Sequence, residues 1–185
     1  MRTISAFNFL TINGFYKGIN EDISWHVHGE EGNQYSIDRL QSGNILLFGR
    51  VTYEMMYSFW PTETAYSLYP IVSEKMNSAE KLVVSNSLNS ASWQNSKIIS
   101  GDIISQISKL KNSPGKNISI LGSGTLITSL TDAGLIDEYE FLIDPLAIGK
   151  GTPIFHNIQN TQRLELTGTR VFEKSGSILL NYNKI

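Results

Sequence analysis

Short apolar runs alternate along the chain with segments whose apolar residues recur at helical spacing. The run NILLFG at residues 44–49 is apolar at nearly every position and is bounded by turn formers, which is typical of a strand buried on both faces. Residues 33–43 place Tyr35, Ile37 and Leu40 on one side of a predicted helix and end in a glycine. The same reasoning predicts further strands at 3–12, 81–85, 96–100, 117–121 and 138–143, and further helices at 51–59, 70–79, 102–111 and 125–134.

The C-terminal segment, residues 163–185, reads as two strands joined by a turn at residues 174–176. Strands interleaved with helices and followed by a terminal hairpin predict an α/β fold with a mostly parallel sheet that carries antiparallel edge strands. No linker, repeat or low-complexity tract interrupts the chain. We therefore expect residues 1–185 to form a single domain.

Composition and charge exclude several classes of partner. The chain has 15 Lys and Arg against 17 Asp and Glu, and its basic residues are scattered, so nucleic acid is not an expected partner. No apolar run approaches the roughly 18 residues needed to span a bilayer, and no signal-peptide core follows the first residues, so we expect a cytoplasmic protein without a membrane partner. The absence of cysteine excludes disulfides and cysteine-based zinc sites.

The stretch ISILGSGTLI, residues 118–127, runs from a predicted strand through a glycine pair into a predicted helix. Backbone N–H groups at the start of a helix are unpaired, the helix dipole adds partial positive charge, and glycine permits the close approach of an anion. Gly122, Ser123, Gly124 and Thr125 therefore suit a diphosphate. The alternative is that the two glycines only make a tight turn between strand and helix.

A second strand-to-helix turn lies in LLFGRVTYE, residues 46–54. Arg50 follows Gly49 there and could form charge-assisted bonds to a phosphate, with the amides of Val51 and Thr52 facing the same anion. The alternative is that Arg50 makes a surface ion pair. Two phosphate cradles indicate a dinucleotide, and they require residues 45–48 and 118–121 to be neighbouring interior strands that open onto one cleft.

Two other sets of polar residues could form sites. Asp144 lies about twenty residues beyond the glycines, where a Rossmann unit keeps its ribose-binding acid, but Ile127 replaces the third glycine and Pro145 indicates a turn. We expect this match to be accidental. His26 and His28 alternate and could be metal ligands, but no third ligand follows at useful spacing, so we expect a solvated surface and no metal site.

Around the two strand-to-helix turns the chain resembles the dihydrofolate reductase-like proteins. It is most similar to stand-alone relatives of the reductase domain of bacterial riboflavin-biosynthesis deaminase/reductases. TINGFYKG resembles the family's S-L-D-G-x-I-A-G, and LLFGRVTYE resembles its L-x-G-R-x-T-Y-E. The block ISILGSGTLITSLTDAGLIDEYEFLIDPLAIGKGTPIF continues the resemblance through its G-S-G, G-L-I-D-E and P-x-x-x-G-x-G-x-P-x-F elements. The resemblance covers nearly the whole chain and implies a mixed, mostly parallel eight-stranded sheet flanked by helices.

The resemblance also implies NADPH as cofactor and a homodimer as the assembly. The terminal hairpin carries ILLNY at residues 178–182, which offers an apolar edge that a partner could cover. Asn13 would lie beside the nicotinamide as the candidate catalytic residue, although relatives usually have Asp there. Asn86 follows Ser85 at a position where many relatives have Arg, beside the place where the 2′-phosphate of NADPH would bind. The implied cofactor residues are Gly14, Gly49, Arg50, Val51, Thr52, Ser85, Gly122, Ser123, Gly124, Thr125 and Leu126, and the implied substrate-binding aromatics are Trp25, Tyr53, Phe59 and Trp60.

The sequence therefore predicts an NADPH-dependent reductase of a small, planar heterocycle such as a pterin, pyrimidine or flavin. Hydride transfer to such a ring leaves an anion that needs a proton. Glu30 and Glu31 precede a helix that faces the substrate in the family, although a charged, solvated helix start explains them equally, and water could supply the proton. The alternative reading is a non-catalytic NADP(H)-binding protein on the same fold.

Overall fold

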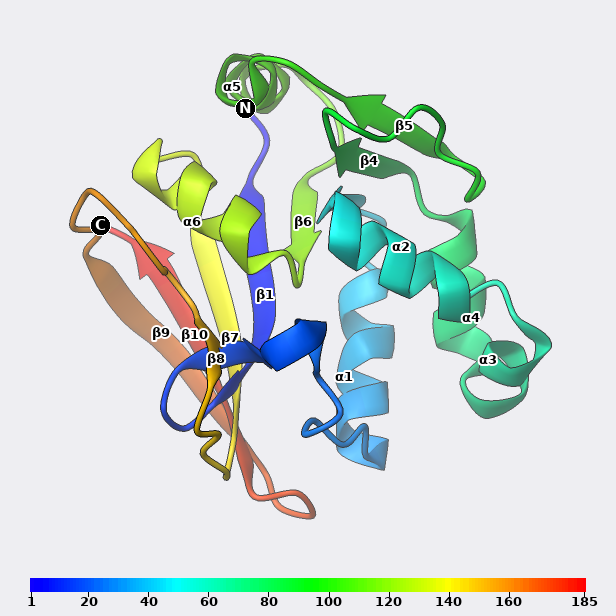
Figure 1. Ribbon diagram of the computed structural model, residues 1–185, viewed down its shortest axis with the longest axis vertical. Coiled ribbons are helices and arrows are strands. Elements are labelled where there is room, and N and C mark those ends of the chain that lie inside the picture. Colours follow the sequence, from blue (N-terminus) through cyan, green and yellow to red (C-terminus); the bar gives the residue numbers. More distant parts are fainter.

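Eight strands form one twisted sheet in the order β5-β4-β3-β6-β1-β7-β10-β9, and two short strands, β2 and β8, pair separately. The computed structural model describes residues 1–185. The six strands from β5 to β7 are mutually parallel, whereas β10 runs antiparallel to both β7 and β9. Figure 1 shows the terminal hairpin at one side of the sheet and helices α2 and α4 toward the other.

The strands are β1 (Ile4–Thr11), β2 (Phe15–Gly18), β3 (Ile45–Gly49), β4 (Lys81–Val84), β5 (Ser96–Ile99), β6 (Ile118–Leu121), β7 (Glu138–Asp144), β8 (Gly151–Pro153), β9 (Leu164–Phe172) and β10 (Ser177–Lys184). The helices are α1 (Glu30–Leu40), α2 (Arg50–Phe59), α3 (Glu63–Leu68), α4 (Pro70–Ser78), α5 (Ile103–Asn112) and α6 (Gly124–Asp132), with a short 3-10 turn, η1 (Ile19–Glu21).

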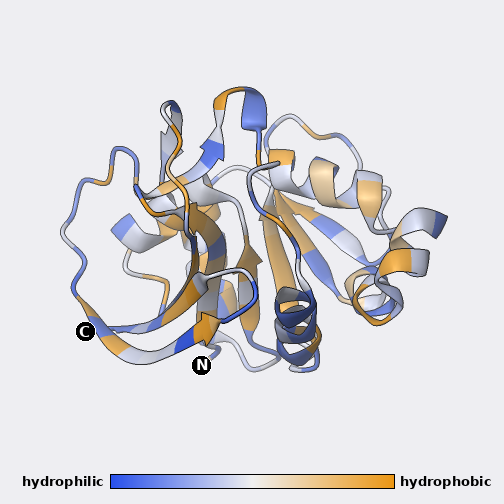
Figure 2. Ribbon diagram, turned by 90° about the horizontal axis from the view of Figure 1, so that it is seen from below, coloured by the Kyte–Doolittle hydropathy of each residue, from blue (hydrophilic) through white to orange (hydrophobic).

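The side chains of β3 show how the two faces of the sheet are covered. Ile45 and Leu47 pack in the core under α5 and α6, whereas Leu46 and Phe48 pack in a second core under α2 and α4. A strand with cores on both faces must be apolar at every position, which explains the run that predicted it. Figure 2 shows the apolar residues concentrated along the central strands.

The predicted fold class is confirmed. The sheet is mixed and mostly parallel, and it ends in an antiparallel hairpin whose turn reaches Gly176 at a φ of +73°. Asp102 caps α5, where its Oδ1 accepts a hydrogen bond from the Ser105 amide at 3.0 Å. No helix is long and apolar enough to cross a membrane.

Two features were not predicted. Helix α3 occupies a segment for which no element was predicted, and its start is capped by Thr62, whose hydroxyl accepts from the Ala65 amide at 3.2 Å. Strands β2 and β8 form a pair that joins residues far apart in the sequence. A Cβ on Gly151 would lie 2.2 Å from the Lys17 carbonyl oxygen, so this pairing requires glycine there.

Candidate functional site

Two strand-to-helix turns meet at one edge of the sheet. Strands β3 and β6 are parallel neighbours, so the turns that follow them lie side by side, as the sequence predicted. The Gly49 amide donates a hydrogen bond to the Ser123 hydroxyl oxygen at 2.9 Å, which joins the turn before α2 to the turn before α6. The two candidate phosphate cradles therefore form one continuous surface.

The second turn depends on its glycine. Gly122 and Ser123 have φ values of +60° and +59°, in the left-handed region that favours glycine. A Cβ on Gly122 would lie 3.1 Å from Cγ2 of Thr52, a contact so tight that Thr52 or the turn would have to shift to admit a side chain. Helix α6 then begins at Gly124, and its first amides are directed out of the turn.

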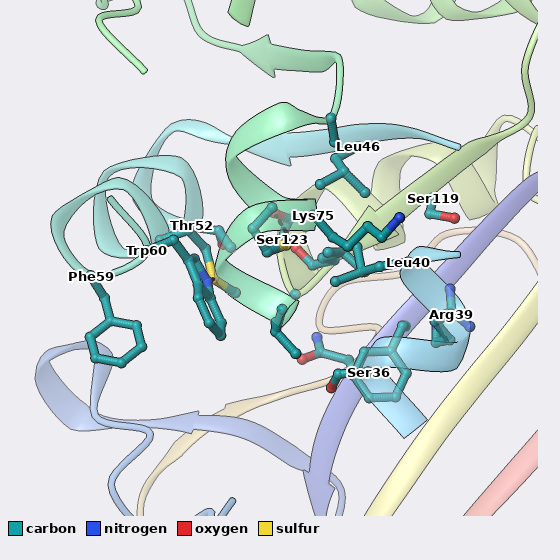
Figure 3. Close-up of a pocket in the computed structure, with 18 of the residues that line it drawn as sticks. Ser36, Arg39, Leu40, Leu46, Thr52, Phe59, Trp60, Lys75, Ser119 and Ser123 are labelled. Atoms are coloured by element: carbon teal, nitrogen blue, oxygen red, sulfur yellow. Dashed lines mark hydrogen bonds between the residues drawn. The ribbon is translucent and has the colours of Figure 1, made fainter. Parts of the chain in front are cut away.

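A cavity of about 800 Å³ opens beside these turns. Its walls come from the face of β1, β3 and β6 on one side and from α1, α2 and α4 around it. In Figure 3, Ser123 lies near the centre of the view, Thr52, Trp60 and Phe59 lie to its left, and Arg39 and Ser119 lie to its right. The lining includes Phe7, Asn8, Phe9, Tyr16, His28, Tyr35, Ser36, Arg39, Val51, Thr52, Met55, Met56, Phe59, Trp60, Tyr69, Gly122 and Ser123.

The cavity brings together part of the expected cofactor set. Val51, Thr52, Gly122 and Ser123 line it. The Arg50 side chain does not: its Nη1 atom lies 2.7 Å from Oε2 of Glu54 in an exposed i,i+4 pair.

The other expected cofactor residues do not line the cavity. Gly124 packs under the Tyr16 ring, which leaves no room for a Cβ, and Leu126 belongs to the core. The Ser85 hydroxyl accepts hydrogen bonds from the amides of two following residues, and Asn86 Oδ1 accepts from the Gly101 amide at 2.8 Å. Thr125 is exposed beside the start of α6.

The expected aromatic residues divide into two groups. Phe59 and Trp60 line the cavity. Tyr53 is buried in the core instead, where its hydroxyl oxygen accepts from the Trp93 amide at 2.9 Å. Trp25 does not line the cavity, and its indole N–H donates to the Asp22 carbonyl at 3.2 Å.

Asn13 lies in the exposed turn after β1 and does not line the cavity. Its Oδ1 accepts from the Thr11 hydroxyl at 2.8 Å, and its Nδ2 donates to the Ile148 carbonyl at 2.9 Å. Gly14 follows with a φ of +84°. In this structure the Asn13 side chain therefore fastens the turn to the loop around Ile148.

The expectation that His26 is solvated was wrong. Its side chain is 6% exposed, and its Nδ1 lies 2.5 Å from Oδ2 of Asp144. The ring stacks on Phe9 with centroids 3.6 Å apart, and Oδ1 of Asp144 accepts from the Ser177 hydroxyl at 2.6 Å. Asp144 is thus fully engaged inside the protein, which agrees with rejecting it as a ribose ligand.

His28 lines the cavity although the residue as a whole is exposed. Desolvation, and then the neighbouring His26, lower its pKa, while Asp144 opposes this effect. A lowered pKa keeps the imidazole neutral near pH 7, so His28 is a hydrogen-bonding group there and not a strong acid.

Comparison with known proteins places these features in a family. Residues 2–176 match the family model described as the RibD C-terminal domain. The chain belongs to this family. It is 29% identical over 178 residues to the uncharacterized protein YyaP of Bacillus subtilis (strain 168), which spans 94% of this chain and 90% of that protein.

Solved structures show the same fold. A putative riboflavin biosynthesis protein from Shewanella sp. PV-4 superimposes with a TM-score of 0.75 at 19% identity, covering 99% of each chain. Dihydrofolate reductase from Enterococcus faecalis, in complex with NADP(H), superimposes with a TM-score of 0.64 at 13% identity, covering 98% of this chain and 96% of that one. The RibD-type chain therefore has the dihydrofolate reductase-like fold.

In this RibD-type chain, α1 lines the cavity with polar side chains that were not predicted from the sequence. The Tyr35 hydroxyl and the Arg39 guanidinium both bind the Glu140 carboxylate on β7. Burial raises the pKa of Tyr35, so the phenol keeps its proton and donates to Glu140. Tyr35 and Arg39 are four residues apart on a helix, which is the only signal of their shared direction; nothing in the sequence indicates Glu140 as their partner.

Proposed function

We propose that this protein is an NADPH-dependent reductase that transfers a hydride to a small, planar heterocycle of the pterin, pyrimidine or flavin type. The observation that carries the proposal is the hydrogen bond between Gly49 and Ser123, which joins two helix starts at the mouth of one cavity. The reductase-domain family and the NADP(H)-bound dihydrofolate reductase with the same fold support it.

The residues at the two turns fit a dinucleotide. Gly122 leaves open the position that a Cβ would occupy against Thr52, and the first amides of α2 and α6 lie at the same edge of the sheet. Backbone N–H groups at helix starts bind phosphate oxygens, so Val51, Thr52 and the Gly122–Gly124 turn would hold the phosphates of the cofactor. NADPH would supply the hydride.

The rest of the cavity suits the flat faces of a heterocyclic ring. Phe59, Trp60 and Tyr69 lie along the part formed by α2 and α4, together with the adaptable side chains of Met55 and Met56. Aromatic and methionine side chains pack against flat rings and exclude water, which favours hydride transfer over side reactions.

A reductase needs a proton donor for the reduced ring, whereas a non-catalytic NADP(H)-binding protein does not. Glu21 is the only carboxylate lining the cavity, and its Oε1 lies 2.6 Å from the ammonium of Lys17. Glu30 and Glu31 instead contact Lys174 on the terminal hairpin, outside the cavity. We infer that the reductase takes its proton from water. The same lack of an unpaired acid favours a non-catalytic NADP(H)-binding protein as the second candidate.

The test combines binding with turnover. NADPH consumption is followed by absorbance with dihydrofolate, pterin, uracil and riboflavin, and NADPH binding is measured in parallel by calorimetry. We expect binding together with consumption in the presence of at least one heterocycle. Binding without consumption, in the wild type and in Asn13→Asp alike, would favour the non-catalytic protein. An absence of binding would refute both functions.

A further inference from the structure

The imidazole of His28 has both of its hydrogen-bonding atoms available at the cavity. The residue lies in the loop between η1 and α1, it is exposed, and it lines the cavity. His26, two positions earlier, is bonded to Asp144, whereas the His28 ring makes no hydrogen bond within the protein. A neutral imidazole has one donor and one acceptor, so the ring can serve a ligand through either atom.

Contacts with the sheet fix the position of this loop. The His26 ring stacks on Phe9 of β1 with centroids 3.6 Å apart, and its Nδ1 lies 2.5 Å from Oδ2 of Asp144 at the end of β7. The other oxygen of this carboxylate accepts from the Ser177 hydroxyl on β10 at 2.6 Å. The His28 ring meets the His26 ring in a T-shaped contact with centroids 4.6 Å apart. The His28 ring is therefore held in place although it has no hydrogen bond of its own.

The ring lies in the part of the cavity that we assign to the heterocycle. It makes T-shaped contacts with Phe9 on β1 and with Tyr69 just before α4, with centroids 5.4 and 6.4 Å apart. Tyr69 in turn contacts Phe59 and Trp60. All five side chains line the cavity. His28 thus places a hydrogen-bonding group among aromatic rings that suit the faces of a flat ligand.

The charge of the ring follows from its surroundings. Desolvation, and then the neighbouring His26, lower the pKa of His28 to about 4, while Asp144 opposes this effect. At neutral pH the ring is therefore uncharged. Glu21, the only carboxylate lining the cavity, is paired with Lys17. This part of the cavity thus offers a ligand hydrogen bonds but no unpaired negative charge.

We propose that the His28 imidazole forms a hydrogen bond with the polar edge of the heterocyclic substrate and selects a ring that binds without charge. This inference rests on the proposed function and deepens it, because it names the group that recognises the substrate. The polar edge is a ring amide, in which an N–H lies beside a C=O, as in uracil, pterin and flavin. A bare imidazole nitrogen accepts from that N–H, and a protonated one donates to that C=O, so either tautomer has a partner.

The test compares His28→Phe with His156→Phe. Phenylalanine keeps a flat ring against Phe9 and Tyr69 but removes both nitrogens. His156 is the matched control, because it is an exposed histidine that does not line the cavity. Calorimetric titrations use uracil, pterin and riboflavin added to the NADP⁺-bound protein, and NADPH added to the free protein.

Only His28→Phe should lose affinity for the heterocycles that the wild type binds, by about tenfold, with NADPH binding unchanged. His28→Gln keeps a donor and an acceptor and should recover most of this loss. His28→Ala repeats the measurement with a smaller side chain, so the test does not depend on one variant folding.

A second measurement tests the charge of the site. 2,4-Diaminopyrimidine takes up a proton readily and pairs with a carboxylate as a cation, whereas uracil stays uncharged. The wild type should bind 2,4-diaminopyrimidine no more tightly than uracil. His28→Asp places a carboxylate at this position, so it should bind 2,4-diaminopyrimidine about tenfold more tightly than the wild type does.

Other outcomes would overturn the inference. If His28→Phe and His28→Ala bind every heterocycle as the wild type does, His28 does not contact the substrate. A wild type that prefers 2,4-diaminopyrimidine to uracil would show that a carboxylate, with Glu21 as the candidate, holds the ring instead. A wild type that binds NADPH but no heterocycle would overturn the inference and leave the non-catalytic protein. A wild type that does not bind NADPH would refute the proposed function itself.

Discussion

Arg50 occupies the first position of α2, beside the amides that we assign to a phosphate. In the free protein its guanidinium pairs with Glu54, and both side chains are almost half exposed. Exposed pairs of this kind contribute only a few tenths of a kcal/mol, whereas charge-assisted bonds to a phosphate contribute about 1.5–3 kcal/mol. We therefore predict that the guanidinium leaves Glu54 when NADPH binds, and that Arg50→Ala weakens NADPH binding by about 1.5–3 kcal/mol.

Calorimetric titration of the wild type and Arg50→Ala with NADPH and with NADH measures the loss of affinity. Glu54→Gln is the control, because it frees the guanidinium without removing it and should bind NADPH at least as well as the wild type. Wild-type and Arg50→Ala proteins with the same affinity for NADPH would remove Arg50 from the site.

Single-residue contacts were the part that the sequence predicted least well. Tyr53 was expected at the cavity, yet its hydroxyl contacts Trp93, forty residues further along the chain. His26 was expected in solvent, yet it contacts Asp144, which lies 118 residues away. Both placements depend on a distant partner, and no local pattern encodes such a partner.

At the scale of elements, the candidate site depends on the contact between the turn before α2 and the turn before α6. Gly122→Ala would place a side chain on a left-handed backbone and 3.1 Å from Cγ2 of Thr52. We predict that this variant loses about 1–3 kcal/mol of unfolding free energy and binds NADPH more weakly, because the backbone is strained and the turn before α6 must shift relative to Thr52 on α2. Chemical denaturation and calorimetry measure the two effects.

Two comparisons make the Gly122 prediction specific. Gly149→Ala adds the same methyl group where no atom lies within 4 Å and φ is not positive, and it should be nearly neutral. Thr52→Ser removes Cγ2, so combining it with Gly122→Ala should restore part of the lost stability and leave the backbone strain. A Gly122→Ala protein as stable as Gly149→Ala would contradict the assigned packing.

The elements themselves were largely predictable, because their signals are local. The strands β3 and β6 were found from apolar runs bounded by turn formers, and α5 from a run that follows its Asp102 cap. The pair β2–β8 was not found, because each strand is short and its partner lies more than a hundred residues away. Helix α3 was missed because its six residues carry too little periodicity to distinguish them from a loop.

At the scale of the whole molecule, the parallel direction of the central strands followed from the alternation of strands and helices, and the eight-stranded sheet came with the family resemblance. Only one pair of neighbours, the strands now seen as β3 and β6, was predicted; the rest of the strand order was not. The sequence also predicted an apolar edge at the segment ILLNY, which was wrong in one respect. This segment belongs to β10, which is paired on both sides by β7 and β9, so the free edge on this side of the sheet is β9.

The assembly predicted for this edge is a homodimer. Val171 on β9 and Ile178 on β10 lie opposite each other in the ladder, and their side chains are 50% and 42% exposed. Exposed apolar pairs at the edge of a sheet are favourable surfaces for a second copy of the chain. We predict a dimeric mass by light scattering at micromolar concentration, and a monomeric mass for Val171→Lys combined with Ile178→Lys. Ile104→Lys, which changes an exposed apolar residue on α5, should leave the dimer intact. A monomeric wild type would refute the dimer, and a dimer that survives the paired lysines would place its interface elsewhere on the molecule.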